Sequence, residues 1–193
     1  MNFAPLPATA AWEHREARAG FEVTFFQRSG EGCRIAGWTT AVEDGKTWAV
    51  EYTIDLDGTG ATRNARLRGR SAGGLFSTLL QADGAGRWQV DGVPAPHLDG
   101  CLDVDLESSA MTNALPVRRM RLAPGAGAAA PAAYVRAVGL AVEQLEQTYL
   151  RAPDEGTRQR YDYAAPAFDF TCRLSYDESG LVLDYPGIAV RAG

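Results

Sequence analysis

The side chains with the most chemical potential lie near the middle of this sequence. Asp103 and Asp105 flank a single valine, and two adjacent arginines, Arg118 and Arg119, follow shortly afterwards. If the segment around the aspartates is a strand, both carboxylates point to one face, because successive side chains of a strand alternate. Carboxylates and guanidinium groups brought together in this way could hold a polar ligand group or pair with each other.

Alternation along residues 115–122, read as a strand, would place Arg118 and Arg119 on opposite faces. Arg118 would then share its face with apolar side chains, and an inward-facing guanidinium needs an acidic partner. We therefore predict that Arg118 pairs with Asp103 or Asp105. Such a pair either braces a bend in the fold or lines a cavity that holds the head group of a ligand.

The same two carboxylates raise the alternative of a hydrolase that acts on a sugar or an ester. Glycoside hydrolysis needs two carboxyl groups roughly 5 to 9 Å apart, and Asp103 and Asp105 at positions i and i+2 of one strand can reach that spacing. Such pairs are common in β proteins, however. Nothing else in the sequence supports a Ser-His-Asp arrangement around its two histidines, His14 and His97. We therefore predict that the protein is not an enzyme.

Composition limits the remaining classes of function. The chain has 193 residues, of which 46% are hydrophobic, which suits a single domain over residues 1–193. Its net charge of -5 and the lack of a basic stripe argue against a nucleic-acid partner. We expect no secretory signal and no membrane span, because no cationic start precedes an apolar core and no run of about 18 apolar residues occurs.

The three cysteines Cys33, Cys101 and Cys172 are widely spaced. This spacing predicts reduced thiols in the cytoplasm and gives no close pair of Cys or His residues for a metal ion. We expect neither a metal site nor a cofactor.

Period-two alternation and tight-turn signals predict a β-rich fold. Trp48, Val50, Tyr52, Ile54 and Leu56 would share one face of a strand. Strand-like runs recur from residue 20 to residue 91 and again from residue 160 to residue 191, and Asp-Gly pairs punctuate the first group. This pattern is typical of an antiparallel meander. The Ala- and Gly-rich segment 123–132 predicts a loop, and residues 138–149 fit a short helix or a strand.

Four tryptophans, seven tyrosines and seven phenylalanines could form an ordinary core or line an apolar pocket. We expect Trp48, Trp88 and Tyr163 to lie near any such cavity.

Two stretches carry a resemblance to a known family: Leu98-Asp-Gly-Cys-Leu-Asp-Val-Asp-Leu106 and Thr112-Asn-Ala-Leu-Pro-Val-Arg-Arg119. Together with weaker matches along nearly the whole chain, they resemble the bacterial Putative glycolipid-binding family, formerly a domain of unknown function. Residues 108–111 depart from the expected turn, and the segment 123–132 resembles a local elaboration.

The resemblance implies an all-β, mainly antiparallel fold: a single spiral β-roll of many strands with little helix, similar to lipoprotein carriers that hold acyl chains. It also implies that residues 138–149 are largely strand. By this resemblance the protein would bind an amphipathic ligand, such as a glycolipid, in an apolar cavity of a curved sheet. The residues that would bind the ligand or brace the site are Asp103, Asp105, Asn113, Arg118, Arg119, Trp48, Trp88 and Tyr163. A structural or protein-interaction module without a ligand is a further alternative, which an exposed sheet edge or apolar patch without a cavity would favour.

Overall fold

The computed structural model describes residues 3–193 and is built almost entirely from strands. Fourteen strands form one antiparallel sheet in the order β10-β13-β14-β15-β16-β17-β1-β2-β3-β4-β5-β6-β7-β8. Its first eight strands in chain order are β1 (Thr9–His14), β2 (Ala19–Ser29), β3 (Gly32–Glu43), β4 (Lys46–Leu56), β5 (Thr62–Ser71), β6 (Gly74–Ala82), β7 (Trp88–Val90) and β8 (Val93–Pro94). The other six are β10 (Gly127–Ala129), β13 (Thr148–Glu155), β14 (Arg158–Ala165), β15 (Phe170–Tyr176), β16 (Val182–Tyr185) and β17 (Ala189–Arg191). The fold is all-β and mainly antiparallel, as predicted.

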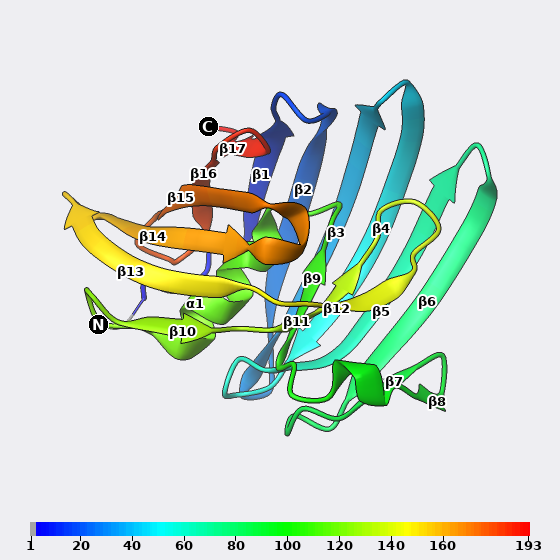
Figure 1. Cartoon of the computed structure of the whole chain (residues 1–193), viewed down its shortest axis with the longest axis horizontal. Helices are drawn as coiled ribbons and strands as arrows, with labels where there is room; N and C mark the ends of the chain where they lie inside the picture. Colours follow the sequence, from blue (N-terminus) through cyan, green and yellow to red (C-terminus); the bar gives the residue numbers. More distant parts are fainter. Residues whose placement is uncertain (1–2) are drawn as a thin grey trace.

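The sheet curls so that its two halves face each other (Figure 1). We call β1–β8 the N-terminal arm, and β10 with β13–β17 the C-terminal arm. The arms join where β17 pairs with β1, so the last strand lies beside the first. In Figure 1 the strands β13–β15 lie across β1 and β2 at a steep angle, with other elements of the chain in the space between the arms.

A second, three-stranded sheet and one helix occupy this space. The small sheet has the order β12-β11-β9, with β9 (Asp103–Leu106) parallel to β11 (Ala132–Val135) and β12 (Val142–Leu145) antiparallel to it. The helix α1 (Ala114–Met120) follows a short 3-10 turn, η2 (Met111–Asn113). Two further 3-10 turns are η1 (Pro96–Leu98) and η3 (Pro166–Phe168).

The core has two parts, one on either side of the small sheet and helix. The first packs Val104, Leu106 and Leu115 against buried side chains of the N-terminal arm such as Tyr52 and Ile54. The second is rich in tyrosine and packs Val117 of α1 against the C-terminal arm. The helix α1 contributes side chains to both parts of the core, so it links the two arms.

The alternation predicted for β4 is confirmed, since Trp48, Val50, Tyr52 and Ile54 are all buried. The Asp44-Gly45 pair forms the turn between β3 and β4, where both residues have positive φ, at 49° and 71°.

The structure differs from three local predictions. Residues 115–122 were read as a strand, but residues 114–120 form α1; Pro116 lies in the first turn of this helix, where a missing N–H is tolerated. The Ala- and Gly-rich segment is not loop throughout, because β10 pairs with β13 at the sheet edge. Residues 142–145 and 148–155 are strands β12 and β13, which excludes the helix considered for 138–149.

Within residues 3–193, no helix has the length and apolar character needed to cross a membrane.

Candidate functional site

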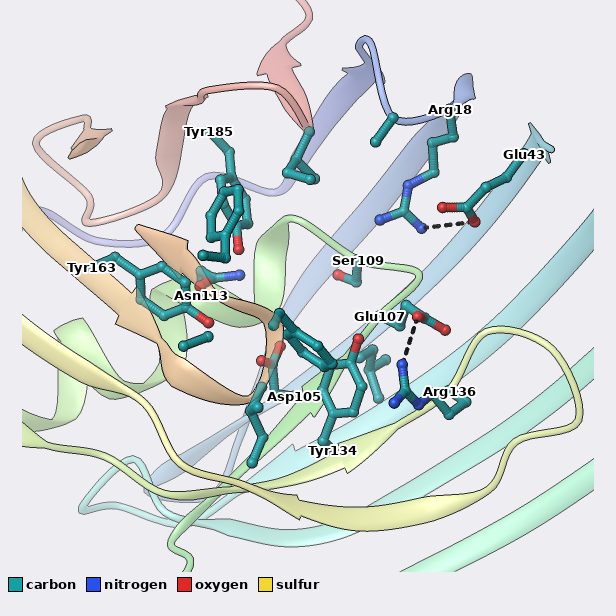
Figure 2. A pocket seen from close by; sticks show the side chains of 17 residues that line it. Arg18, Glu43, Asp105, Glu107, Ser109, Asn113, Tyr134, Arg136, Tyr163 and Tyr185 are labelled. Atoms are coloured by element: carbon teal, nitrogen blue, oxygen red, sulfur yellow. Dashed lines mark hydrogen bonds and ion pairs between the residues drawn. The ribbon is translucent and has the colours of Figure 1, made fainter. Parts of the chain in front are cut away.

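A cavity of about 230 Å³ opens between the two arms, next to the β1–β2 turn and the end of the β3–β4 hairpin. Both arms, the small sheet and the loop between β9 and η2 contribute to its walls (Figure 2). Its lining mixes apolar side chains with ten polar or charged ones: Arg18, Glu43, Asp105, Glu107, Ser109, Asn113, Tyr134, Arg136, Tyr163 and Tyr185.

Asp105 on β9 is the innermost acid of this cavity. Its Oδ1 accepts a hydrogen bond of 2.7 Å from the hydroxyl of Thr112, which η2 places directly beside it. Burial raises the pKa of Asp105 to about 6, a tendency that the Thr112 hydrogen bond opposes. Near neutral pH this carboxyl group can therefore act as either a donor or an acceptor toward a ligand hydroxyl.

A buried carboxylate, Glu22 of β2, secures the loop that forms the cavity floor. It accepts hydrogen bonds from the hydroxyls of Ser109 and of Tyr52, the latter at 2.6 Å, and from the backbone N–H of Ala110 at 2.9 Å. Burial raises the pKa of Glu22, whereas these donors lower it. The group links β2 and β4 to the loop after β9, so the position of Ser109 in the cavity wall depends on it.

Gly37 makes room for this arrangement. It lies opposite Tyr52 in the β3–β4 pairing, and a Cβ atom there would stand only 2.2 Å from the Tyr52 ring. The absence of a side chain lets the phenol ring cross β3 and reach Glu22 on the neighbouring strand.

Three tyrosines, Tyr134, Tyr163 and Tyr185, form much of the cavity wall. Burial raises the pKa of each, so all three phenols stay protonated. The Tyr163 and Tyr185 rings pack edge to face, with centroids 6.0 Å apart. Such rings present an apolar surface together with hydroxyls that can donate and accept hydrogen bonds, a combination that suits a sugar or polyol.

Two arginines approach the cavity, Arg18 from the β1–β2 turn and Arg136 from the segment just after β11 (Figure 2). Arg136 is paired with Glu107 at 3.2 Å and with Glu143 at 2.7 Å. Arg18 has only a loose pair, in which its Nη1 lies 4.0 Å from Oε2 of Glu43.

The predicted aspartates separate into two roles. Asp103 does not line the cavity; Arg119 holds it side-on, with Nη2 2.6 Å from Oδ2 and Nε 3.0 Å from Oδ1. The arginine predicted to pair with the aspartates, Arg118, instead donates to the backbone carbonyl of Ser179 and lies over the Phe3 ring. The prediction that Arg118 pairs with an aspartate was wrong, because Arg119 makes that pair. The segment is helical, so strand alternation does not apply to it.

Of the other predicted residues, Asn113 and Tyr163 line the cavity. The Asn113 side chain accepts a hydrogen bond of 3.0 Å from Tyr149. Trp88 is buried elsewhere, with its indole N–H donating to the carbonyl of Cys101. Trp48 is a core residue whose ring lies 5.5 Å below the Arg18 guanidinium.

Sequence reasoning missed Arg18, Glu22 and Ser109. Two signals were available: Ser109 falls in the stretch 108–111 that departs from the family pattern, and Glu22 falls in one of the weaker matches to that pattern. Arg18 and Glu22 lie far from the aspartates along the chain, and only the curled sheet brings them close.

The fold and cavity together define a class: an all-β protein whose curled antiparallel sheet encloses a small mixed polar and apolar pocket. The chain matches the family described as Putative glycolipid-binding over residues 9–191. It belongs to that family.

Two solved structures are similar to it. A DUF1089 family protein from Pseudomonas aeruginosa has 31% sequence identity and a TM-score of 0.75, covering 89% of this chain and 92% of that one. A β-barrel-like protein of the domain of unknown function DUF1849 from Brucella abortus shares the fold at 11% identity, with a TM-score of 0.55 and coverage of 98% and 95%. None of the curated proteins matches the chain.

Proposed function

We propose that this protein binds the head group of an amphipathic ligand, such as a glycolipid, in the cavity between its two arms, and that it does so without catalysis. The main support for this proposal is the composition of the cavity wall. Protonated tyrosines, Asp105 and Asn113 offer hydrogen bonds beside the apolar surfaces of Phe168, Phe170 and Ile188. The family to which the chain belongs supports a ligand-binding role of this kind.

The size of the cavity limits what it encloses. At about 230 Å³ it is smaller than the roughly 300 to 1,000 Å³ typical of sites that take whole drug-sized ligands. The small sheet and α1 lie between the arms, and the separate cavity that α1 lines against the N-terminal arm holds only about 130 Å³. A polar head group would therefore lie inside, and an acyl chain would leave through the mouth, where Phe168 is 42% exposed.

The proposal excludes catalysis by the pair Asp103 and Asp105. Both oxygens of Asp103 are held by Arg119, and its side chain is 1% exposed. A mechanism with two carboxyl groups needs both to reach the substrate. Asp105 alone faces the cavity, in a position suited to hydrogen bonding.

We also infer a reducing compartment, such as the cytoplasm. Cys33, Cys101 and Cys172 are free thiols. Burial raises the pKa of Cys101 to about 11 and that of Cys172 to about 12, so both stay protonated and unreactive.

Native mass spectrometry of the purified protein, followed by lipid extraction, tests the binding proposal. We expect an adduct that yields an amphipathic molecule on extraction. The variant Ala17→Trp adds bulk at an exposed position in the cavity lining and should lose the adduct. Ala85→Trp, exposed in a distant turn, should keep it. Equal adducts on both variants would contradict binding in this cavity.

A further inference from the structure

Arg18 is a buried cation without a matching anion. Its side chain is 6% exposed, and within residues 3–193 neither its Nε nor its Nη1 has a hydrogen-bond partner. The Glu43 carboxylate lies beyond hydrogen-bond distance at 4.0 Å, and it also accepts from the Trp48 indole at 3.4 Å. Burying a charged group without such partners is strongly unfavourable.

The guanidinium faces the cavity. Figure 2 shows it reaching from the β1–β2 turn toward the space bounded by Ser109 and Tyr185. Burial raises the pKa of Tyr134 and Tyr185, and the positive charge of Arg18 opposes that shift, which places it within electrostatic reach of both phenols. Burial, and after it the charge of Arg18, lowers the pKa of His14 to about 4, so His14 is neutral and adds no second positive charge beside Arg18.

The remaining charges of the cavity do not neutralise Arg18. Glu107 is committed to Arg136 and to the backbone N–H of Ala137, the latter at 2.7 Å. Asp105 is hydrogen-bonded to Thr112, on the far side of the cavity from Arg18 in Figure 2. Arg18 is therefore the cation of the cavity left available to a ligand.

We propose that Arg18 binds an oxyanion, a carboxylate or a phosphate, on the head group of the ligand. The inference rests on the proposed function and narrows it to an acidic amphipathic ligand, such as an acidic glycolipid. A guanidinium presents paired N–H donors in a planar fork that matches the two oxygens of either anion. Asp105, Asn113 and the tyrosine hydroxyls would then take the neutral hydroxyls of the same head group.

Two probes that differ only in this charge test the inference. Octyl glucoside carries a neutral hydroxymethyl group where octyl glucuronide carries a carboxylate. Their dissociation constants are to be measured by isothermal titration calorimetry below the micelle concentration, with free glucuronate as the probe that lacks a chain. We expect octyl glucuronide to bind more than about tenfold more tightly than octyl glucoside, because hydrogen bonds to charged groups are worth at least that factor.

The variant Arg18→Met keeps a long apolar side chain and removes the charge. It should bind both octyl probes equally, whereas Arg15→Met, on an exposed residue of the same turn, should keep the preference for the glucuronide. Arg18→Met should also melt at the same temperature as the unliganded wild type or higher, because the buried charge has no partner in the protein. This melting temperature separates lost recognition from lost folding.

Three outcomes distinguish a failure of the Arg18 proposal from a failure of the proposed function. Equal binding of the two octyl probes to the wild type would overturn the role of Arg18 and leave the proposed function standing. Glucuronate binding as tightly as octyl glucuronide, with the same loss in Arg18→Met, would support the oxyanion site and overturn the amphipathic ligand. No binding of any probe would count against both.

Discussion

Arg119 on α1 and Asp103 on β9 form a side-on ion pair, with Nη2 2.6 Å from Oδ2, at the point where the helix meets the small sheet. Asp103 is almost completely buried, and burial raises its pKa even though the guanidinium opposes that shift. The pair fixes α1 against β9 and thereby sets the loop that carries Ser109 and Asn113 into the cavity. Its role is to position the binding site.

Replacing Arg119 by methionine should lower the free energy of unfolding by about 3 to 5 kcal/mol, because it leaves the Asp103 charge buried without a partner. Denaturant titration measures this loss. Arg121→Met, at an exposed residue just past the same helix, is the matched control and should change stability by less than about 0.5 kcal/mol. Similar small effects for both variants would show that the pair does not brace the fold.

The floor of the cavity should depend on the hydroxyl of Ser109. Ser109→Ala removes one donor to the buried Glu22 carboxylate and should cost about 1 to 3 kcal/mol of stability. Thermal unfolding followed by circular dichroism gives the change. Ser77→Ala, at an exposed position of β6, removes the same hydroxyl where it touches solvent and should be nearly neutral. A neutral Ser109→Ala would mean that Glu22 does not hold the loop.

Asp105→Asn should stabilise the protein near neutral pH. Burial raises the folded-state pKa of Asp105 from its ordinary 3.8 to about 6. The folded state therefore holds this proton more tightly than the unfolded chain, and stability is lost as the pH rises from about 4 to 7. Complete ionisation of Asp105 lowers the free energy of unfolding by about 3 kcal/mol. We therefore expect the variant to be more stable than the wild type by about 1 to 3 kcal/mol at pH 7.5 and by much less at pH 4.5.

Urea titrations of the wild type and the variant at both pH values measure this difference. His14, whose pKa is lowered to about 4, acts in the opposite sense, because acidification below about 6.5 protonates the unfolded chain first. That contribution is common to both proteins and cancels in the comparison. Asp99→Asn, at an exposed aspartate, is the control. If Asp105→Asn were less stable than the wild type at pH 7.5, the surroundings of Asp105 would not favour its neutral, protonated form, and the prediction would be wrong.

Local patterns predicted much of the sheet, because alternation and turn signals act over a few residues. Trp48 to Ile54 in β4 and the Asp44-Gly45 turn are examples. The same reasoning failed at Arg118 and Arg119, where a segment with strand-like composition forms a helix whose spacing exchanges the roles of the two residues.

The candidate site was only partly predictable. Asp105, Asn113 and Tyr163 were anticipated because they lie in or near the family pattern. Arg18 was not, since its environment combines a turn between β1 and β2 with the β3–β4 hairpin and the loop after β9. Only the curvature of the sheet brings these segments together, and no local pattern encodes that curvature.

The most direct test of the central claim locates the ligand on the protein. We propose to titrate isotope-labelled wild-type protein with octyl glucuronide and to follow backbone amide chemical shifts by NMR. The account predicts saturable shifts around Arg18, the loop 106–113 and Tyr185, and their loss in Ala17→Trp but not in Ala85→Trp. Shifts confined to the outer face of the sheet, around the exposed Phe25 and Trp38, or no shifts at all, would contradict it.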